Sequence, residues 1–92
     1  MQIKIFGKPD CSACSQMHDK MLRTVEKLET ADAITVNYID TATEDGLVES
    51  AFNDISEIPT VILEKDGRTI ARFDGGVKDS RDLREIINGN AD

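Results

Sequence analysis

The two cysteines of this chain, Cys11 and Cys14, are three residues apart and stand where one sequence pattern ends and another begins. Residues 2–6 alternate apolar and polar side chains, which predicts a short strand. Residues 12–29 carry apolar side chains at helical spacing, Cys14 among them, which predicts a helix. The pair therefore lies at a strand-to-helix junction, in the first turn of the helix.

The rest of the chain continues to alternate strands with helices. Apolar patterning predicts further strands over residues 34–39, 59–63 and 69–73. The first of these three is apolar enough for burial on both faces. Asp66-Gly67 is typical of a two-residue hairpin turn, so the last two strands are expected to pair antiparallel.

Two more helices are expected between and after these strands. The first opens on the capping box Thr41-Ala42-Thr43-Glu44, although Gly46 in its first turn weakens it. The last takes Asp79 or Ser80 as its cap and stops at Gly89. The apolar side chains that form the stripes of these two helices are Leu47, Val48, Ala51, Phe52, Ile55, Leu83, Ile86 and Ile87.

The resulting element order is βαβαββα. A βαβ crossover makes its two strands parallel, whereas a tight turn makes its two strands antiparallel. We therefore predict an α/β fold with a mixed four-stranded sheet and three flanking helices. A chain of 92 residues has no room for a second independent core, so residues 1–92 are expected to form a single domain.

The charge balance excludes some classes of partner. Asp and Glu outnumber Lys and Arg by 18 to 11, for a net charge of −7, which argues against binding to nucleic acid or to an anionic membrane. Residues 28–64 contain no Lys or Arg. We interpret this stretch as a solvated acidic face on the second helix; the alternative is a surface that steers a basic protein partner.

Neither a signal-peptide core nor a membrane span is present as an apolar run in the sequence. The chain is therefore expected to be cytoplasmic, monomeric and not bound to a membrane. Structural disulfides are rare in the cytoplasm, so a close cysteine pair indicates catalysis or metal binding.

The position of the pair favours thiol chemistry. The free backbone N–H groups and the dipole at a helix N-terminus stabilise a thiolate and lower its pKa. Cys14 falls on the apolar stripe and should be the less accessible sulfur. We therefore expect Cys11 to attack a substrate disulfide and Cys14 to resolve the mixed disulfide that results.

A metal-binding or metal-delivery module is the alternative. Cys14 and His18 are one helical turn apart, so Cys11, Cys14 and His18 could supply three soft ligands. A closed zinc site needs four ligands, and the chain has no further Cys or His. A carboxylate or a second subunit would have to complete the site.

Two motifs together resemble the thioredoxin/glutaredoxin family. One is the Cys-Ser-Ala-Cys pair at the first strand-to-helix junction, and the other is Glu57-Ile58-Pro59-Thr60-Val61 at the start of the third strand. The resemblance implies a thioredoxin-like fold and a thiol–disulfide oxidoreductase with no bound cofactor. It further implies that Pro59 is cis and faces the cysteines, and that Ile58, Pro59 and Thr60 bind an extended substrate.

Within this family the chain resembles the small, glutaredoxin-like members. Lys8 stands three residues before Cys11, as a lysine does in those proteins, and Gly75-Gly76 stands where they hold the γ-glutamyl end of glutathione. Ser12-Ala13 and Ile58-Pro59-Thr60 depart from the glutaredoxin pattern. The resemblance thus implies a disulfide-containing protein substrate, with either glutathione or a reductase as electron donor, and assigns Lys8, Gly75 and Gly76 to ligand binding.

Overall fold

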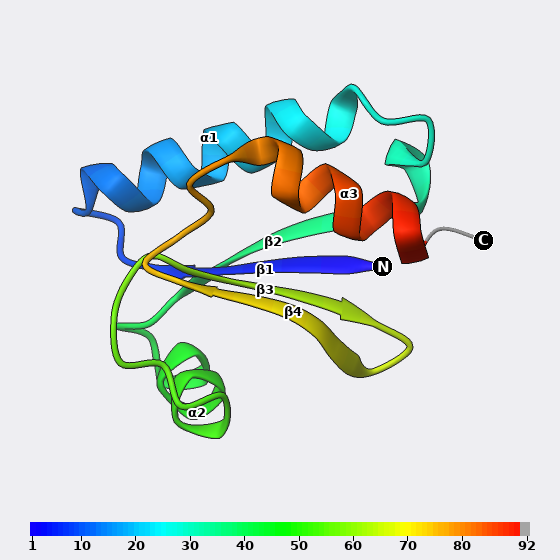
Figure 1. Cartoon of the computed structure of the whole chain (residues 1–92). Helices are drawn as coiled ribbons and strands as arrows, with labels where there is room; N and C mark the ends of the chain where they lie inside the picture. Colours follow the sequence, from blue (N-terminus) through cyan, green and yellow to red (C-terminus); the bar gives the residue numbers. More distant parts are fainter. Residues whose placement is uncertain (91–92) are drawn as a thin grey trace.

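A four-stranded mixed sheet forms the centre of the computed structural model, which describes residues 1–90 (Figure 1). The strands are β1 (Gln2–Gly7), β2 (Thr35–Asp40), β3 (Thr60–Lys65) and β4 (Arg68–Asp74), in the order β2-β1-β3-β4. β1 runs parallel to β2 and antiparallel to β3, and β3 runs antiparallel to β4. The predicted mixed sheet is confirmed.

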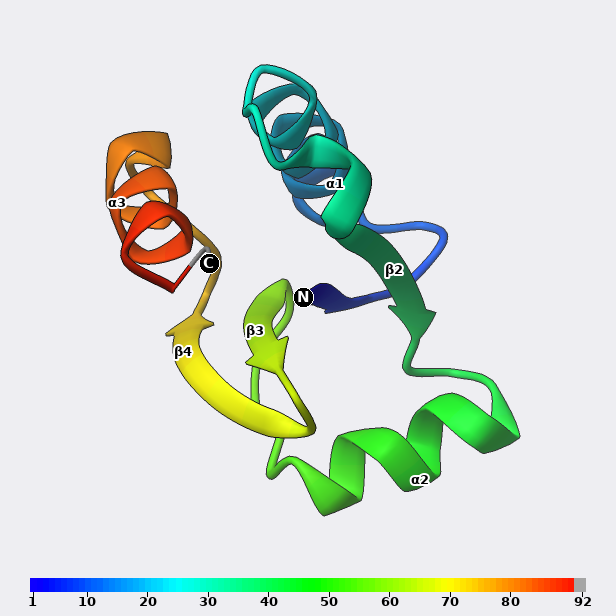
Figure 2. The ribbon, with the colours of Figure 1, turned by 90° about the vertical axis from the view of Figure 1, so that its right-hand side faces the viewer.

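The three helices cover the two faces of the sheet unequally (Figure 2). α1 (Ser12–Glu26) and α3 (Ser80–Asn90) lie on one face, and α2 (Glu44–Phe52) lies on the other. A short 3-10 turn, η1 (Ala31–Ala33), connects α1 to β2. The predicted order βαβαββα is therefore confirmed. None of the helices within residues 1–90 is long and apolar enough to cross a membrane.

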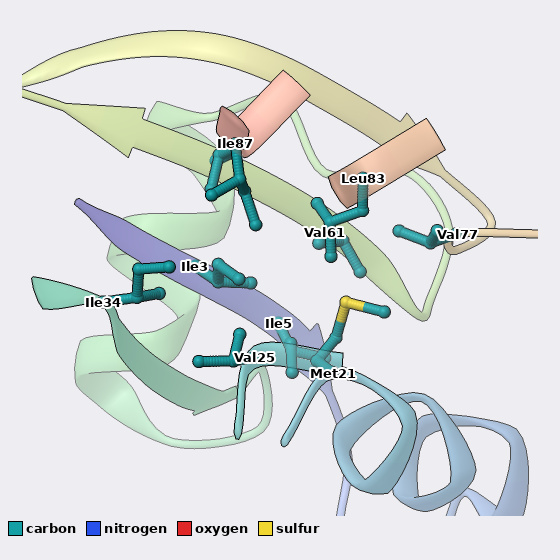
Figure 3. Close-up of a cluster of buried hydrophobic side chains, with 10 residues drawn as sticks. Ile3, Ile5, Met21, Val25, Ile34, Val61, Val77, Leu83 and Ile87 are labelled. Carbon is teal, nitrogen blue, oxygen red and sulfur yellow. The ribbon is translucent and has the colours of Figure 1, made fainter. Parts of the chain in front are cut away.

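The hydrophobic core lies between the sheet and the two helices α1 and α3 (Figure 3). Each strand sends alternate side chains into it because successive residues point to opposite faces of a sheet. Full burial of one such side chain contributes about 1.5–3 kcal/mol. The buried members of this core are Ile3, Ile5, Met21, Val25, Ile34, Val61, Leu63, Val77, Leu83 and Ile87.

On the opposite face, α2 is rotated relative to the prediction. Leu47, Val48 and Phe52 are exposed, so the predicted apolar stripe of this helix does not pack on the sheet. The helix instead turns a polar side inward, where Glu49 pairs with Lys4 of β1. The helix also ends at Phe52, before Ile55, so the last apolar residue of the expected stripe lies outside it.

The helix ends differ in detail from the sequence prediction. α2 is capped by Thr43 rather than Thr41, because the Thr43 hydroxyl accepts the N–H of Gly46 at 3.0 Å. α1 ends at Glu26, before Glu29. α3 continues through Gly89 to Asn90, so Gly89 does not end it.

The hairpin turn agrees with the sequence prediction, whereas the burial of β2 does not. The Asp66-Gly67 turn has positive φ at both residues, 54° and 78°, which confirms the predicted hairpin. β2 lies at the sheet edge and has no fully buried residue, so the expected burial on both faces is wrong. Its outer edge has no neighbouring strand among residues 1–90.

Candidate active site

Three loops meet at one end of the sheet because of the strand register. Thr60 pairs with Phe6 on one side and with Asp74 on the other. The residues just beyond these pairs, Gly7 and Gly75 among them, therefore come to the same end of the sheet. α1 also begins at this end, on the left of Figure 1, so the cysteine pair lies there.

Cys11 and Cys14 form a disulfide at the N-terminus of α1, with their Cα atoms 5.2 Å apart. Cys11 is the N-cap of the helix, and its Sγ accepts the N–H of Cys14 at 3.1 Å. A sulfur in this position is stabilised as a thiolate by the free N–H groups of the first turn. Cys14 is fully buried whereas Cys11 is partly exposed, in agreement with the expected difference in access.

The loop before Cys11 is held by a strand residue that the sequence did not single out. The Lys8 carbonyl oxygen accepts the N–H of Cys11 at 3.3 Å and the hydroxyl of Tyr38 at 2.8 Å. Burial, followed by the negative charges of Asp40 and Asp10, raises the pKa of Tyr38 above its ordinary value. The phenol therefore stays protonated and keeps donating this hydrogen bond at neutral pH.

Gly7 allows Tyr38 and Cys14 to approach each other. A Cβ on Gly7 would lie 2.5 Å from the Tyr38 hydroxyl oxygen and 2.9 Å from the Cys14 Sγ. Real Cβ atoms do not come this close to other heavy atoms, so any other residue would push the tyrosine or the buried cysteine away. The close packing at this point depends on glycine.

Ile58-Pro59 is a cis peptide bond, as the family resemblance implied. Pro59 and Thr60 are buried, and Ile58 is half-buried. The Thr60 hydroxyl donates a 2.7 Å hydrogen bond to the carbonyl oxygen of Glu57. This bond ties the start of β3 to the residues that precede the proline.

The loop after β4 packs against this proline. Gly75 and Gly76 both have positive φ, 84° and 102°, which favours glycine. A Cβ on Gly76 would lie 2.6 Å from the Met17 Cε and 3.5 Å from the Pro59 Cγ, so Gly76 fits between these two side chains. The Lys20 ammonium holds the next part of the loop, donating to the carbonyl oxygens of Val77 and Lys78 at 3.0 Å each.

A carboxylate lies beside the glycine pair. A Cβ on Gly75 would be 3.6 Å from the Glu57 Oε2, which is ordinary van der Waals contact. Any ligand group that reached Gly75 would therefore meet a negative charge. This proximity is not visible in the sequence, where Glu57 and Gly75 are separated by a whole hairpin.

A groove of about 330 Å³ adjoins the loop that leads to Cys11. It lies between α2 and the segment before Pro59, and Lys8 and Ile58 share its wall. The residues lining it are Lys8, Thr41, Leu47, Ser50, Ile55, Ser56, Glu57 and Ile58. Leu47, Ile55 and Ile58 give this groove apolar surface, and the other lining residues are polar or charged, so it can hold a peptide side chain.

The predicted site residues are thus brought together in two groups. Pro59 and Gly76 meet beside Met17, while Lys8 and Ile58 line the groove. The sequence did not single out Tyr38, Glu57 or Met17 as site residues. For Tyr38, the available signal is its place near the end of the strand next to β1, where its hydroxyl can reach the cysteine loop.

Cys11, Cys14 and His18, the three residues considered as metal ligands, are not grouped as a metal site. Within residues 1–90, no three Cys, His, Asp or Glu side chains are grouped so that they could hold a metal ion. The His18 ring packs against the Tyr38 ring, with 5.2 Å between their centroids. His18 is therefore part of the packing around the cysteine loop.

Comparisons with solved structures agree with this architecture. A malarial protein superimposes with a TM-score of 0.76 at 23% identity, covering 99% of this chain and 97% of that one. Thioredoxin 1 from Thermosipho africanus superimposes with a TM-score of 0.76 at 22% identity, covering 97% of this chain and 92% of that one. Thioredoxin O2 from Arabidopsis thaliana superimposes with a TM-score of 0.77 at 19% identity, covering 99% of this chain and 75% of that one. At these identities the likeness shows the fold, which confirms the predicted thioredoxin-like α/β fold.

No curated protein matches the sequence. The sequence profile of the thioredoxin-like domain matches residues 2–89, which is nearly the whole chain and includes both cysteines, Pro59 and the glycine pair. With the disulfide at the start of α1 and the cis-proline at the start of β3, this match shows that the chain belongs to the thioredoxin-like domain family.

Proposed function

We propose that the protein is a thiol–disulfide oxidoreductase that reduces disulfides in other proteins. The observation that carries the proposal is the Cys11–Cys14 disulfide at a helix N-terminus, with one accessible and one buried sulfur. This arrangement gives the two cysteines different roles. Membership of the thioredoxin-like family supports the same class of reaction.

The reaction proceeds in two exchange steps. In the reduced protein the Cys11 thiolate attacks one sulfur of a substrate disulfide, forms a mixed disulfide and releases the other substrate sulfur as a thiolate. The Cys14 thiol then loses its proton and attacks the Cys11 sulfur. This closes the internal disulfide and releases the second substrate thiolate. The substrate gains two electrons, and the protein is left as the disulfide.

The substrate is proposed to bind as an extended segment next to the cis-proline. Ile58 is half-buried and lines the groove that Lys8 also lines. A segment paired with the Ile58 backbone would place its own disulfide toward Cys11. Thr60 supports this binding edge through its bond to the carbonyl oxygen of Glu57.

For the electron donor, the charges favour a protein over glutathione. Glutathione has two carboxylates and one ammonium, so it is negative overall, and the glycine pair that would hold its γ-glutamyl end lies next to the Glu57 carboxylate. Asp10, adjacent to Cys11, adds a further negative charge. Like charges at this range disfavour binding. The proposed donor is therefore a protein reductase. We further propose that the protein acts as a monomer in the cytoplasm.

The test is insulin reduction with dithiothreitol as the donor. The wild type should accelerate it and Cys11→Ser should not. Reduced Cys14→Ser, mixed with insulin after the dithiothreitol has been removed, should accumulate a mixed disulfide visible by mass spectrometry. Equal rates for the wild type and Cys11→Ser would refute the proposal. Zinc or iron that stays bound in stoichiometric amount through dialysis would instead favour the metal-binding alternative.

A further inference from the structure

The outer face of α2 carries an apolar patch. Leu47, Val48 and Phe52 are 59%, 67% and 88% exposed, and Ala51 lies exposed among them on the same side of the helix. Large apolar side chains gathered on one exposed face are typical of a contact surface. We call these four residues the α2 surface.

Contacts along the helix fix this orientation. Near its start, Gly46 lies so close to the Asp40 carbonyl oxygen that any Cβ there would overlap it. In its middle, the Glu49 Oε2 lies 3.4 Å from the Lys4 Nζ. These residues share the inward face, because positions three apart lie on one side of a helix. Rotating the helix to bury Phe52 would break both contacts.

The C-terminal end of α2 is fastened in the same orientation. Arg72 of β4 donates to the carbonyl oxygens of Asn53 and Asp54, with 2.8 Å from its Nη2 to the Asp54 oxygen. These carbonyls follow the last turn of α2, where helix carbonyls lack partners within the helix. The exposure of the α2 surface is therefore a consequence of how the helix is anchored.

The surroundings of the α2 surface are acidic. Glu44 and Asp45 lie in the first turn of the helix, and Asp54 follows its end. The basic residue at that end, Arg72, is bonded to the Asn53 and Asp54 carbonyl oxygens and paired with Asp74, so it does not offset these acidic groups, and Lys8 lies in the adjoining groove. No lysine or arginine occurs in residues 28–64. A second copy of this chain would bring the same negative charge to the contact, which disfavours self-association. A partner that carries Lys and Arg around apolar side chains fits both features.

The α2 surface is continuous with the redox site. Leu47 belongs to it and also lines the groove that contains Lys8 and Ile58. The Lys8 carbonyl is bonded to the N–H of Cys11. A partner seated on α2 can therefore extend along the groove to the accessible sulfur without leaving the protein surface.

We propose that the α2 surface docks a protein partner of the redox reaction, through apolar side chains of that partner flanked by Lys and Arg. The inference rests on the proposed function for the reaction that follows docking. Phe52 and Val48 supply the apolar contacts, and the acidic residues accelerate encounter.

The test uses two designed helical peptides as probes. Both carry leucines along one face; one has lysines beside them and the other has glutamates. Each has one cysteine held as a mixed disulfide with 2-mercaptoethanol. In the Cys14→Ser background, the Cys11 thiolate attacks the peptide sulfur, bonds to the peptide and releases 2-mercaptoethanol thiolate. The rate of this release is divided by the rate with 2-hydroxyethyl disulfide, a small neutral substrate.

This ratio should be larger for the lysine peptide than for the glutamate peptide, and added salt should narrow the difference. Val48→Ser with Phe52→Ser should lower the lysine-peptide ratio about tenfold, the size of a modest hot-spot loss. Leu22→Ser is the matched control, because Leu22 is 42% exposed on α1, across the sheet. It should leave the ratio unchanged.

An unchanged ratio in the double variant, or an equal loss in Leu22→Ser, would overturn the docking proposal. Self-association of the wild type that Phe52→Ser abolishes in analytical ultracentrifugation would overturn it as well, because the occupant would be a second copy. Failure of Cys11 to react even with 2-hydroxyethyl disulfide would instead count against the proposed function.

Discussion

The hydroxyl of Tyr38 donates a 2.8 Å hydrogen bond to the carbonyl oxygen of Lys8, three residues before Cys11. The edge strand β2 thereby holds the loop that presents the reactive sulfur. The bond joins residues 30 positions apart in the sequence.

Tyr38→Phe should lower the free energy of unfolding by about 1 kcal/mol, because the Lys8 carbonyl loses a partner while the ring packing against His18 is kept. Urea unfolding of the two proteins measures the difference. Tyr38→Phe should also slow attack by Cys11 on 2-hydroxyethyl disulfide. If stability and rate are both unchanged, the bond has no role in holding the loop.

The raised pKa of Tyr38 predicts a loss of stability at high pH. The folded protein keeps the phenolic proton more tightly than the unfolded chain, so this contribution is complete below pH 10 and declines as pH rises through the folded-state pKa. Unfolding free energies measured across this range should therefore fall more steeply for the wild type than for Tyr38→Phe. Parallel curves would contradict the prediction.

The lowered pKa of Asp79 predicts a loss of stability at low pH. Its hydrogen bonds from the Arg81 side chain and backbone N–H lower its pKa to about 2. A carboxylate with a depressed pKa stabilises the folded state above its unfolded value near 4 and loses that effect as pH falls toward 2. Asp79→Asn should flatten the acid limb of the stability curve, whereas Asp82→Asn serves as a neighbouring control. NMR titration of the Asp79 carboxyl checks the pKa directly.

Two glycine-to-alanine changes in helices should have opposite effects. Gly46→Ala places a Cβ against the Asp40 carbonyl oxygen and should destabilise the protein by about 1–3 kcal/mol or more. Gly89→Ala has open space around its Cβ and should be neutral or stabilising by up to about 1 kcal/mol, since alanine is the better helix former. Urea unfolding of both variants measures the change in the free energy of unfolding. If Gly46→Ala does not lower it, α2 can move away from β2.

Glu57 is predicted to restrict the use of glutathione. Glu57→Gln should raise the rate with a glutathione mixed disulfide relative to a neutral disulfide, and Glu57→Lys should raise it further. The control is Glu26→Gln at the far end of α1, about 22 Å along the helix from Cys11 and beyond the range of most surface charge effects. If the Glu57 variants behave like the control, the carboxylate beside Gly75 does not select against glutathione.

Local signals determined most of the elements and the position of the cysteines. Apolar periodicity located the strands and helices and placed Cys11 and Cys14 at the start of a helix, and Asp66-Gly67 located the hairpin. These features depend on backbone preferences and on residues close together in the chain, which a sequence contains directly.

The tertiary structure alone decided which way α2 faces and what surrounds the cysteines. An amphipathic pattern says that one side of a helix is apolar, but the anchoring of Glu49 by Lys4 turned the polar side inward. The proximity of Glu57 to Gly75 likewise requires the strands to be in register. Such contacts join residues that are distant in sequence, and their geometry depends on packing between elements rather than on any local pattern.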